Sequence, residues 1–309
     1  MDGLLTALEA VYPMLVALGA GMLTRRLGLV TDDGLREMNR LVYKLFFPVM
    51  LFVNVMDSDF GAGFSWRLPL IASGFTAAAF LALMALVPHL EKEPSRRGVM
   101  VQGIFRSNFL VFGLSIVTAL YGTDRLAPVT LMAAVVVPLM NGLSVVALEV
   151  FRGGRPRGWR IALSVMKNPI VAGTLAAFAC RAAGLDPLPQ ATRSLAQVGT
   201  PFALVVIGAS FQARNAARYR RQLMLCVPAK LVIMPAAAVA AGVLLGLRNE
   251  ALVALMAVAG GPCATASQAM AQQMGGDGEL AGLLVVCTSM MCAGTFFLWI
   301  YALTSLGLA

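Results

Sequence analysis

The chain has 309 residues, of which 59% are hydrophobic and only 13% are charged. About a quarter of the residues in a soluble domain are charged, so this composition excludes an ordinary soluble domain. The net charge is +9. The basic residues fall between long apolar runs, which favours a role in membrane topology over nucleic-acid binding, and no nucleic-acid partner is predicted.

Runs of about 20 apolar residues recur along the whole chain, each long enough to cross a bilayer as a helix. The sequence therefore predicts an all-α polytopic membrane protein with the lipid bilayer as its surroundings. Its first run lacks the basic n-region of a signal peptide, so we expect a span there. The ten predicted spans are residues 4–24, 38–56, 68–89, 98–121, 127–151, 161–183, 190–211, 222–247, 250–274 and 280–306.

The basic residues between the spans are distributed unevenly. With the N-terminus outside, the inner loops carry 17 Lys and Arg residues and the outer loops carry five. The positive-inside rule then predicts that both termini lie on the outer side of the cell's inner (plasma) membrane. The last inner loop, 275–279, does not follow this charge pattern because it has no basic residue.

The two halves of the chain repeat. Pro13, Gly28 and Leu29 match Pro169, Gly184 and Leu185 at a constant offset, and Asn108 matches Pro262. Each half holds five spans, an odd number, so the halves must be inverted relative to each other, as in many secondary transporters. The predicted units are a first repeat at 1–152, a short linker at 153–160 and a second repeat at 161–309.

Two predicted spans are interrupted at matching places. The ninth contains Gly260, Gly261 and Pro262 in its middle, and the fourth contains Arg106-Ser107-Asn108. Proline removes a backbone donor and glycine adds backbone freedom, so both helices are expected to break. An interrupted helix is tolerated within the membrane only where protein or a water-filled cavity satisfies its unpaired backbone N–H and C=O groups. The two interruptions therefore favour a substrate site over a simple kink.

Several short segments resemble one known family in their order along the chain. They are MNRLVYKLFFP at 38–48, FRSNF at 105–109, LYG at 120–122, NP at 168–169, GTP at 199–201, GAS at 208–210, AQQ at 271–273 and GD at 276–277. These segments resemble the auxin efflux carrier family, which includes plant PIN-type carriers and bacterial malonate and malate permeases. The resemblance covers nearly the whole chain.

The resemblance implies ten helices as a five-plus-five inverted repeat, with broken helices four and nine crossing. It also implies a scaffold, a mobile part and an elevator-like motion. The chain departs from the family pattern at Leu110, Cys263 and Ala264, and it has only a short central loop at 151–159. These departures leave open which carboxylate is carried.

Two basic residues lie inside predicted spans. An intramembrane arginine is a functional candidate by default, and Arg106 could hold a carboxylate through both of its terminal nitrogens. The alternative is that its long side chain snorkels to the membrane surface, and the sequence favours neither reading. Lys230 poses the same question in the eighth span, and there snorkelling is favoured.

Half-helix ends at the two breaks would offer free backbone donors to an anion. Nearby polar side chains could bind the substrate or simply pack between helices, and Asn141 is a weaker candidate of the same kind. The predicted substrate-binding residues are Asn54, Arg106, Ser107, Asn108, Pro262, Cys263, Thr265, Ser267 and Gln268.

The sequence as a whole predicts a secondary transporter for small organic anions such as mono- or dicarboxylates. The alternative is a channel or a sensor component. An enzyme is not expected, because no acid–base pair, metal spacing or nucleophile with a base stands out. With one histidine and few acidic residues inside spans, no metal or cofactor is predicted. Coupling to H⁺ or Na⁺ and formation of a homodimer are left open.

Overall fold

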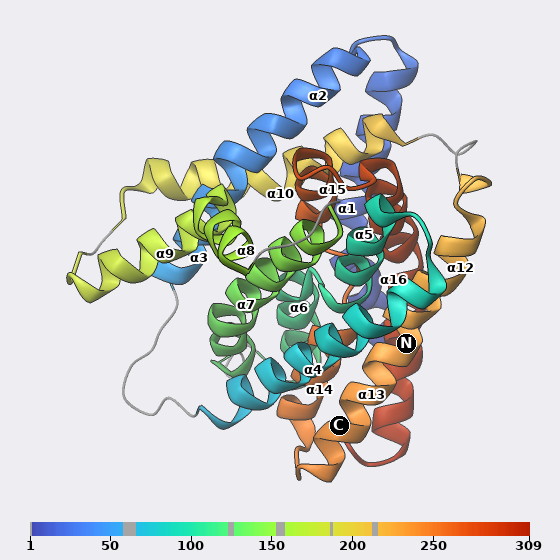
Figure 1. Ribbon diagram of the computed structural model, residues 1–309. Helices are drawn as coiled ribbons and strands as arrows, with labels where there is room; N and C mark the ends of the chain where they lie inside the picture. The colour runs from blue at the N-terminus through green and yellow to red at the C-terminus, as the bar shows by residue number, and fades with distance from the viewer. Residues whose placement is uncertain (1, 58–65, 123–126, 153–157, 186–187, 212–215) are drawn as a thin grey trace.

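The computed structural model describes residues 2–57, 66–122, 127–152, 158–185, 188–211 and 216–309 (Figure 1). Within these ranges the secondary structure is helical apart from one isolated β-bridge, which confirms the all-α fold class. The helices are α1 (Asp2–Arg26), α2 (Asp32–Leu41), η1 (Val42–Phe46), α3 (Phe47–Met56), α4 (Arg67–Leu90), α5 (Pro94–Phe105), α6 (Phe109–Tyr121), α7 (Ala127–Phe151), α8 (Gly158–Lys167), α9 (Pro169–Ala182), α10 (Gln190–Ser210), α12 (Arg220–Pro228), η3 (Ala229–Ile233), α13 (Met234–Leu244), α14 (Asn249–Gly260), α15 (Ala266–Gln273) and α16 (Gly278–Ser305).

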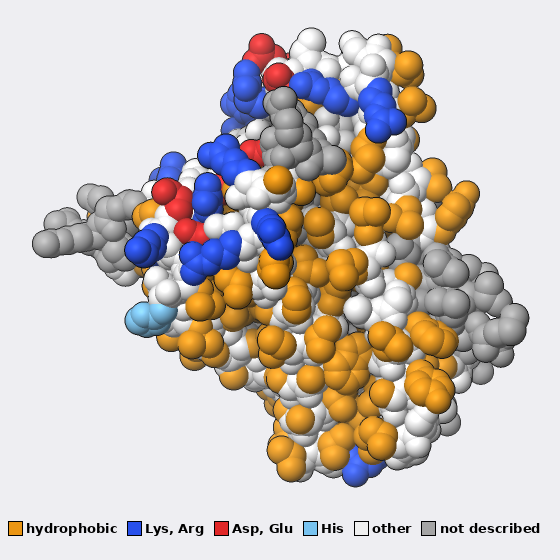
Figure 2. Space-filling view, turned by 90° about the vertical axis from the view of Figure 1, so that its right-hand side faces the viewer, with side chains coloured by type: hydrophobic (Ala, Val, Ile, Leu, Met, Phe, Trp, Pro, Cys, Tyr) orange, Lys and Arg blue, Asp and Glu red, His pale blue; other side chains and the backbone are white. Residues whose placement is uncertain are grey.

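Several of the described helices are long and apolar enough to cross a membrane. Five qualify on their own: Asp32–Met56, Arg67–Leu90, Met132–Phe151, Arg220–Leu244 and Gly278–Ser305. A bent pair can form a sixth span. Figure 2 shows hydrophobic side chains over most of one face, with Lys and Arg gathered toward one end. These features indicate a multi-pass membrane protein, whereas the predicted ten-span repeat with its three units stays a prediction. Most of the predicted linker lies outside the described residues.

The predicted sixth span, 161–183, is not one straight helix. Its two parts, Ile161–Lys167 and Pro169–Ala182, meet at an angle of 67°. Asn168 lies between them in an extended conformation, and its Oδ1 accepts a hydrogen bond from Ile170 N at 3.0 Å. A residue before proline avoids the α-helical region, and asparagine is a good N-cap, so the Asn-Pro pair ends one helix and starts the next.

Two π-helical segments, η1 and η3, interrupt longer helices. Each ends two residues before a proline, Pro48 in α3 and Pro235 in α13. The amide of Phe47 bonds to Val42 O, five residues back, and Met234 bonds to Ala229 O in the same way. Such widened turns often mark functional sites, and they relieve the clash that a proline ring makes with the preceding turn.

The helices α1 and α10 approach each other at glycines. A Cβ added at Gly21 of α1 would lie 2.0 Å from Val205 O, and one at Gly208 of α10 would lie 2.1 Å from Leu18 O. Small residues that let backbones approach closely are the usual basis of helix packing in membranes. These two glycines therefore fix the distance between α1 and α10.

We expect Gly21→Val to destabilise the protein, because the atoms that it would strike belong to backbone and cannot move aside. Overpacking of this kind costs about 1–3 kcal/mol, which lowers Tm by about 2–12 °C. Gly19→Val is the matched control, since the Cβ site at Gly19 has no atom within 4 Å among the described residues. Thermal unfolding in detergent measures both variants, and equal Tm values would contradict this account of the contact.

The helices pack as two groups. One group contains α1, α3, α9 and α10, and the other contains α4 to α7 and α12 to α16; the two groups meet where α1 packs against α16 and α6. Both broken helices belong to the second group. Figure 1 shows α5 and α15 above the level of the breaks and α6 and α14 below it. The two interruptions, 106–108 and 261–265, lie among the buried residues of the core.

Candidate substrate site at the two helix breaks

The two breaks are hydrogen-bonded to each other. Ser107 and Cys263 form an antiparallel β-bridge, and Asn108 N donates to Pro262 O at 2.9 Å. Pro262 has no amide hydrogen to give to Val258 O, one turn back, and Ser107 Oγ donates to that carbonyl at 2.6 Å instead. Each break thus supplies groups that the other one lacks, and the predicted contact between the fourth and ninth apolar segments is present.

The last carbonyls of α14 are satisfied from outside the helix. In a continued helix, Cys263 N would bond to Ala259 O, but it donates to Thr288 Oγ1 of α16 at 2.9 Å. Ala259 O instead accepts a hydrogen bond from Lys230 Nζ at 2.9 Å. Because buried carbonyls must be paired, these side chains stabilise the open end of the helix.

Arg106 is buried beside the breaks and is only 4% exposed. Its Nη2 donates to Asn141 Oδ1 at 2.5 Å, and its Nη1 lies 2.9 Å from Met270 Sδ. No carboxylate of the described residues comes within ion-pair distance of it. The guanidinium therefore does not snorkel, and it is held in the interior by neutral partners.

Lys230 also stays inside, and the expectation that it snorkels is wrong. The residue is fully buried, with 0% of its surface exposed. The prediction failed because it considered only the length of the side chain and the distance to the surface. The open carbonyl of Ala259 provides a nearer partner that a single sequence does not reveal.

A cavity of about 90 Å³ lies against the two breaks. Two residues that line it carry unpaired donors: Asn108 Nδ2 and Asn141 Nδ2 are buried without an acceptor anywhere in the described ranges. Arg106 lines the same cavity. A buried space with one cation and two unpaired N–H groups is suited to an acceptor with negative charge. The lining residues are Phe47, Met50, Leu51, Asn54, Arg106, Ser107, Asn108, Phe109, Val137, Met140, Asn141, Ile170, Thr200, Ala264, Thr265 and Ala266.

The helices that leave the breaks begin at this cavity. Phe109 opens α6 and Ala266 opens α15, and both residues line it. The preceding residues, Asn108 and Thr265, make no side-chain cap hydrogen bond in the described structure. The first amides of a helix carry a partial positive charge, so both ends add to a field that favours an anion.

Two further cavities adjoin the region. One of about 160 Å³ shares Leu51, Asn54 and Val137 with the cavity at the breaks and extends to Asp57. The other, of about 470 Å³, lies between α2, α10, α15 and α16, where Asn39 Nδ2 donates to Gln272 Oε1 at 2.5 Å. Two arginines line it, but each is paired with an aspartate, so it offers less charge to an anion.

Five of the nine predicted binding residues line the cavity at the breaks. They are Asn54, Arg106, Ser107, Asn108 and Thr265.

The other four predicted residues are placed elsewhere. Pro262 contributes its carbonyl to Asn108 N, and the Cys263 thiol donates to Ser267 Oγ at 3.5 Å with both side chains buried. Gln268 lines the larger cavity of 470 Å³. Residues that follow Pro262 in sequence turn to different sides of the break, which spacing alone does not predict.

Sequence reasoning underrated or missed the residues that support Arg106 and the break in the ninth apolar segment. Asn141 on α7 accepts its hydrogen bond, and Gln102, one turn earlier on α5, donates from Nε2 to Ser267 O at 3.1 Å. Thr288 holds the backbone of Cys263. The available signal was a polar residue inside an apolar run, and a spacing of four ties Gln102 to Arg106 on one helix face.

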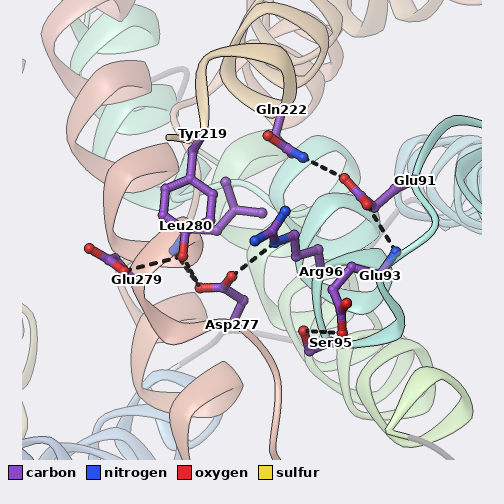
Figure 3. A network of polar contacts seen from close by, with 9 residues as sticks. All are labelled: Glu91, Glu93, Ser95, Arg96, Tyr219, Gln222, Asp277, Glu279 and Leu280. Carbon is purple, nitrogen blue, oxygen red and sulfur yellow. Dashed lines mark hydrogen bonds and ion pairs between the residues drawn. The ribbon is translucent and has the colours of Figure 1, made fainter. Parts of the chain in front are cut away.

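A network of charges joins three connecting segments at one end of the molecule (Figure 3). Arg96 Nε lies 3.2 Å from Asp277 Oδ2, and Tyr219 Oη lies 3.1 Å from both Asp277 and Glu279. Burial and these carboxylates raise the pKa of Tyr219 well above its ordinary value, so it stays a donor. Arg96, in the first turn of α5, therefore supplies a positive charge to the acidic segment at 275–279.

Glu91 extends this network toward α12. Burial of Glu91 would raise its pKa, but the hydrogen bonds from Glu93 N and Gln222 Nε2 and the charge of Arg96 lower that pKa below the usual value. A carboxylate stabilised in this way stays ionised. The contacts hold the ends of α4, α5, α12 and α16 together.

Two family comparisons match different parts of the chain. Residues 6–153 match a family described as "Membrane transport protein", and residues 201–307 match one described as "Sodium Bile acid symporter family". Both matches indicate a secondary membrane transporter. Each matched region contains one of the two breaks. No individual curated protein is similar enough to count as a match.

These findings support the predicted class of protein. They agree with a transporter and with the absence of an enzymatic role, and they imply a small-molecule substrate. The printed family names leave the carboxylate substrate and the mechanism as proposals.

Proposed function

We propose that this transporter carries small organic anions, such as mono- or dicarboxylates, and binds them where the two helix breaks meet. Arg106 receives the carboxylate through its guanidinium, and the side-chain amides of Asn108 and Asn141 donate to its oxygens. Malonate, malate and auxin-like carboxylates are the first candidates, in keeping with the resemblance of the sequence to carriers of such anions.

The observation that carries this proposal is the buried guanidinium of Arg106 without a carboxylate partner in the described structure. An uncompensated buried charge is costly, and a substrate of opposite charge removes that cost when it binds. The two unpaired amides beside it are satisfied by the same ligand. One small anion therefore pairs with the guanidinium and accepts hydrogen bonds from both amides.

The size of the space also favours a small ligand. The cavity at the breaks measures about 90 Å³ and the adjoining one about 160 Å³. Pockets for drug-sized ligands hold about 300–1,000 Å³. A carboxylate of a few carbon atoms fits such a space, with its charged end at Arg106 and its remainder toward Asn54, which lines both cavities.

For the mechanism, we propose that the group of helices that contains the breaks moves against the group of α1, α3, α9 and α10. The cavity at the breaks lies between these groups, because Phe47, Ile170 and Thr200 line it from one side and the breaks line it from the other. Sliding of one group would expose the bound anion on alternate sides of the membrane, as in an elevator.

The proposed orientation places both termini outside the plasma membrane. Segments predicted on the same side contact each other: Arg96 pairs with Asp277 among the inner loops, and Asp57 pairs with Arg193 among the outer ones. Reporter fusions after Arg155 and after Ala309 are expected to give opposite signals, and equal signals would contradict the topology.

Uptake into proteoliposomes tests the proposed substrate class. We expect saturable uptake of labelled malonate or malate that other carboxylates inhibit and that the neutral amide malonamide does not. Uptake that rises linearly with concentration would favour the alternative, a channel. Chemical conversion of the substrate, or no uptake of any carboxylate in the panel, would contradict the proposal.

A further inference from the structure

The lysine in the centre of the second half of the chain is not part of the anion cavity. Lys230 lies on η3, one of the two π-helical segments, and it is fully buried. Its Nζ donates to Ala259 O at 2.9 Å, and no carboxylate of the described chain pairs with it. A buried ammonium without a counter-ion is energetically costly, so a functional role is expected for it.

The ammonium lies at the C-terminal end of α14, which indicates its role. The end of α14 is a half-helix C-terminus, where unpaired carbonyls carry a partial negative charge. Val258 O and Ala257 O are already bonded, to Ser107 Oγ and Gly261 N, and Ala259 O is bonded to Lys230. In transporters with broken helices, such C-terminal ends and unwound carbonyls are the places where a coupling cation binds.

We propose that the ammonium of Lys230 is a tethered cation that occupies the place of a soluble coupling cation at the end of α14, so that transport by this chain does not require sodium. The carbonyl oxygen that would coordinate sodium is already bonded to Lys230 Nζ, so sodium cannot bind there without displacing the lysine. The match of residues 201–307 to a family named for sodium symport contains both Lys230 and Ala259.

The groups around Lys230 leave it as the side chain that bonds to Ala259 O. Cys263, from the break in the ninth apolar segment, is the ionisable group of the described residues that interacts with Lys230, and its thiol donates to Ser267 Oγ and not to Ala259 O. Two cations then flank the crossing: Arg106 faces the anion cavity, and Lys230 holds the helix end behind it.

The inference rests on the proposed transport function, and its test has one readout that is independent of it. For the wild-type chain in proteoliposomes, we expect equal carboxylate uptake in sodium chloride and in choline chloride. Lys230→Ala should lose roughly tenfold or more of its uptake in choline, because an open carbonyl is left buried. Sodium should restore part of that uptake by entering the vacated space.

Thermal unfolding in detergent provides the independent readout. Sodium chloride in place of choline chloride should leave the Tm of the wild type unchanged and raise that of Lys230→Ala by about 2–4 °C. Lys44→Ala is the matched control, because Lys44 is an exposed lysine on the other π-helical segment, and it should behave like the wild type.

Three results would overturn the inference. They are wild-type uptake that requires sodium, a wild-type Tm that rises with sodium, and a Tm of Lys230→Ala that sodium does not change. A wild type that transports no carboxylate contradicts the proposed function, and the Tm comparison then still decides the role of Lys230.

Discussion

Replacing Arg106 by glutamine should reduce carboxylate uptake by about 30- to 4,000-fold. Removing one partner of a buried charge pair costs about 2–5 kcal/mol, which corresponds to that range of affinity. Glutamine keeps most of the length of the side chain and can still donate to Asn141 Oδ1, so the fold is expected to survive. Labelled uptake at several substrate concentrations measures the change as a higher apparent KM.

Two further variants make this result specific. Arg106→Lys keeps the charge but loses the planar fork, and it should retain only part of the affinity. Arg67→Gln removes an exposed arginine that donates to Leu245 O, and it should transport like the wild type. An unchanged KM for both Arg106 variants would mean that the anion binds elsewhere.

The second large effect is expected at Asn108, where the order of uptake should be wild type, then Asn108→Ala, then Asn108→Asp. Loss of a buried hydrogen bond costs about 1–3 kcal/mol, or about 5- to 150-fold in affinity. A carboxylate at this position adds repulsion toward the substrate. The backbone bond from Asn108 N to Pro262 O is available in all three proteins, so the contact between the breaks is preserved.

Initial rates of uptake compare the three proteins, and size-exclusion profiles in detergent check that each is folded. Equal uptake by the Asp and Ala variants would show that the amide does not face an anion.

The sequence predicted the interruptions well because their causes are local. Pro262 lacks a donor whatever surrounds it, and the two glycines before it weaken the helix. The residues after it were predicted less well. Cys263, Ser267 and Gln268 follow the same break, but the first two bond to each other in the interior and Gln268 lines the larger cavity, because the direction of each side chain depends on how the second break crosses the first.

The two intramembrane cations show the same limit. The side chains of Arg106 and Lys230 have similar lengths, and the sequence left snorkelling open for Arg106 and favoured it for Lys230. Their real partners, Asn141 and Ala259, come from helices 35 and 29 residues away in the chain. A pattern along one helix contains no information about such partners, so the sequence identified the residues and the structure assigned their contacts.

The central claim is that the anion binds between the two breaks, and a structure determined with a bound carboxylate tests it most directly. We predict that the carboxylate oxygens lie about 2.7–2.9 Å from Arg106 nitrogens and within hydrogen-bond distance of Asn108 Nδ2. A carboxylate bound instead in the larger cavity beside Arg36 and Gln272, with the space at the breaks empty, would contradict the account.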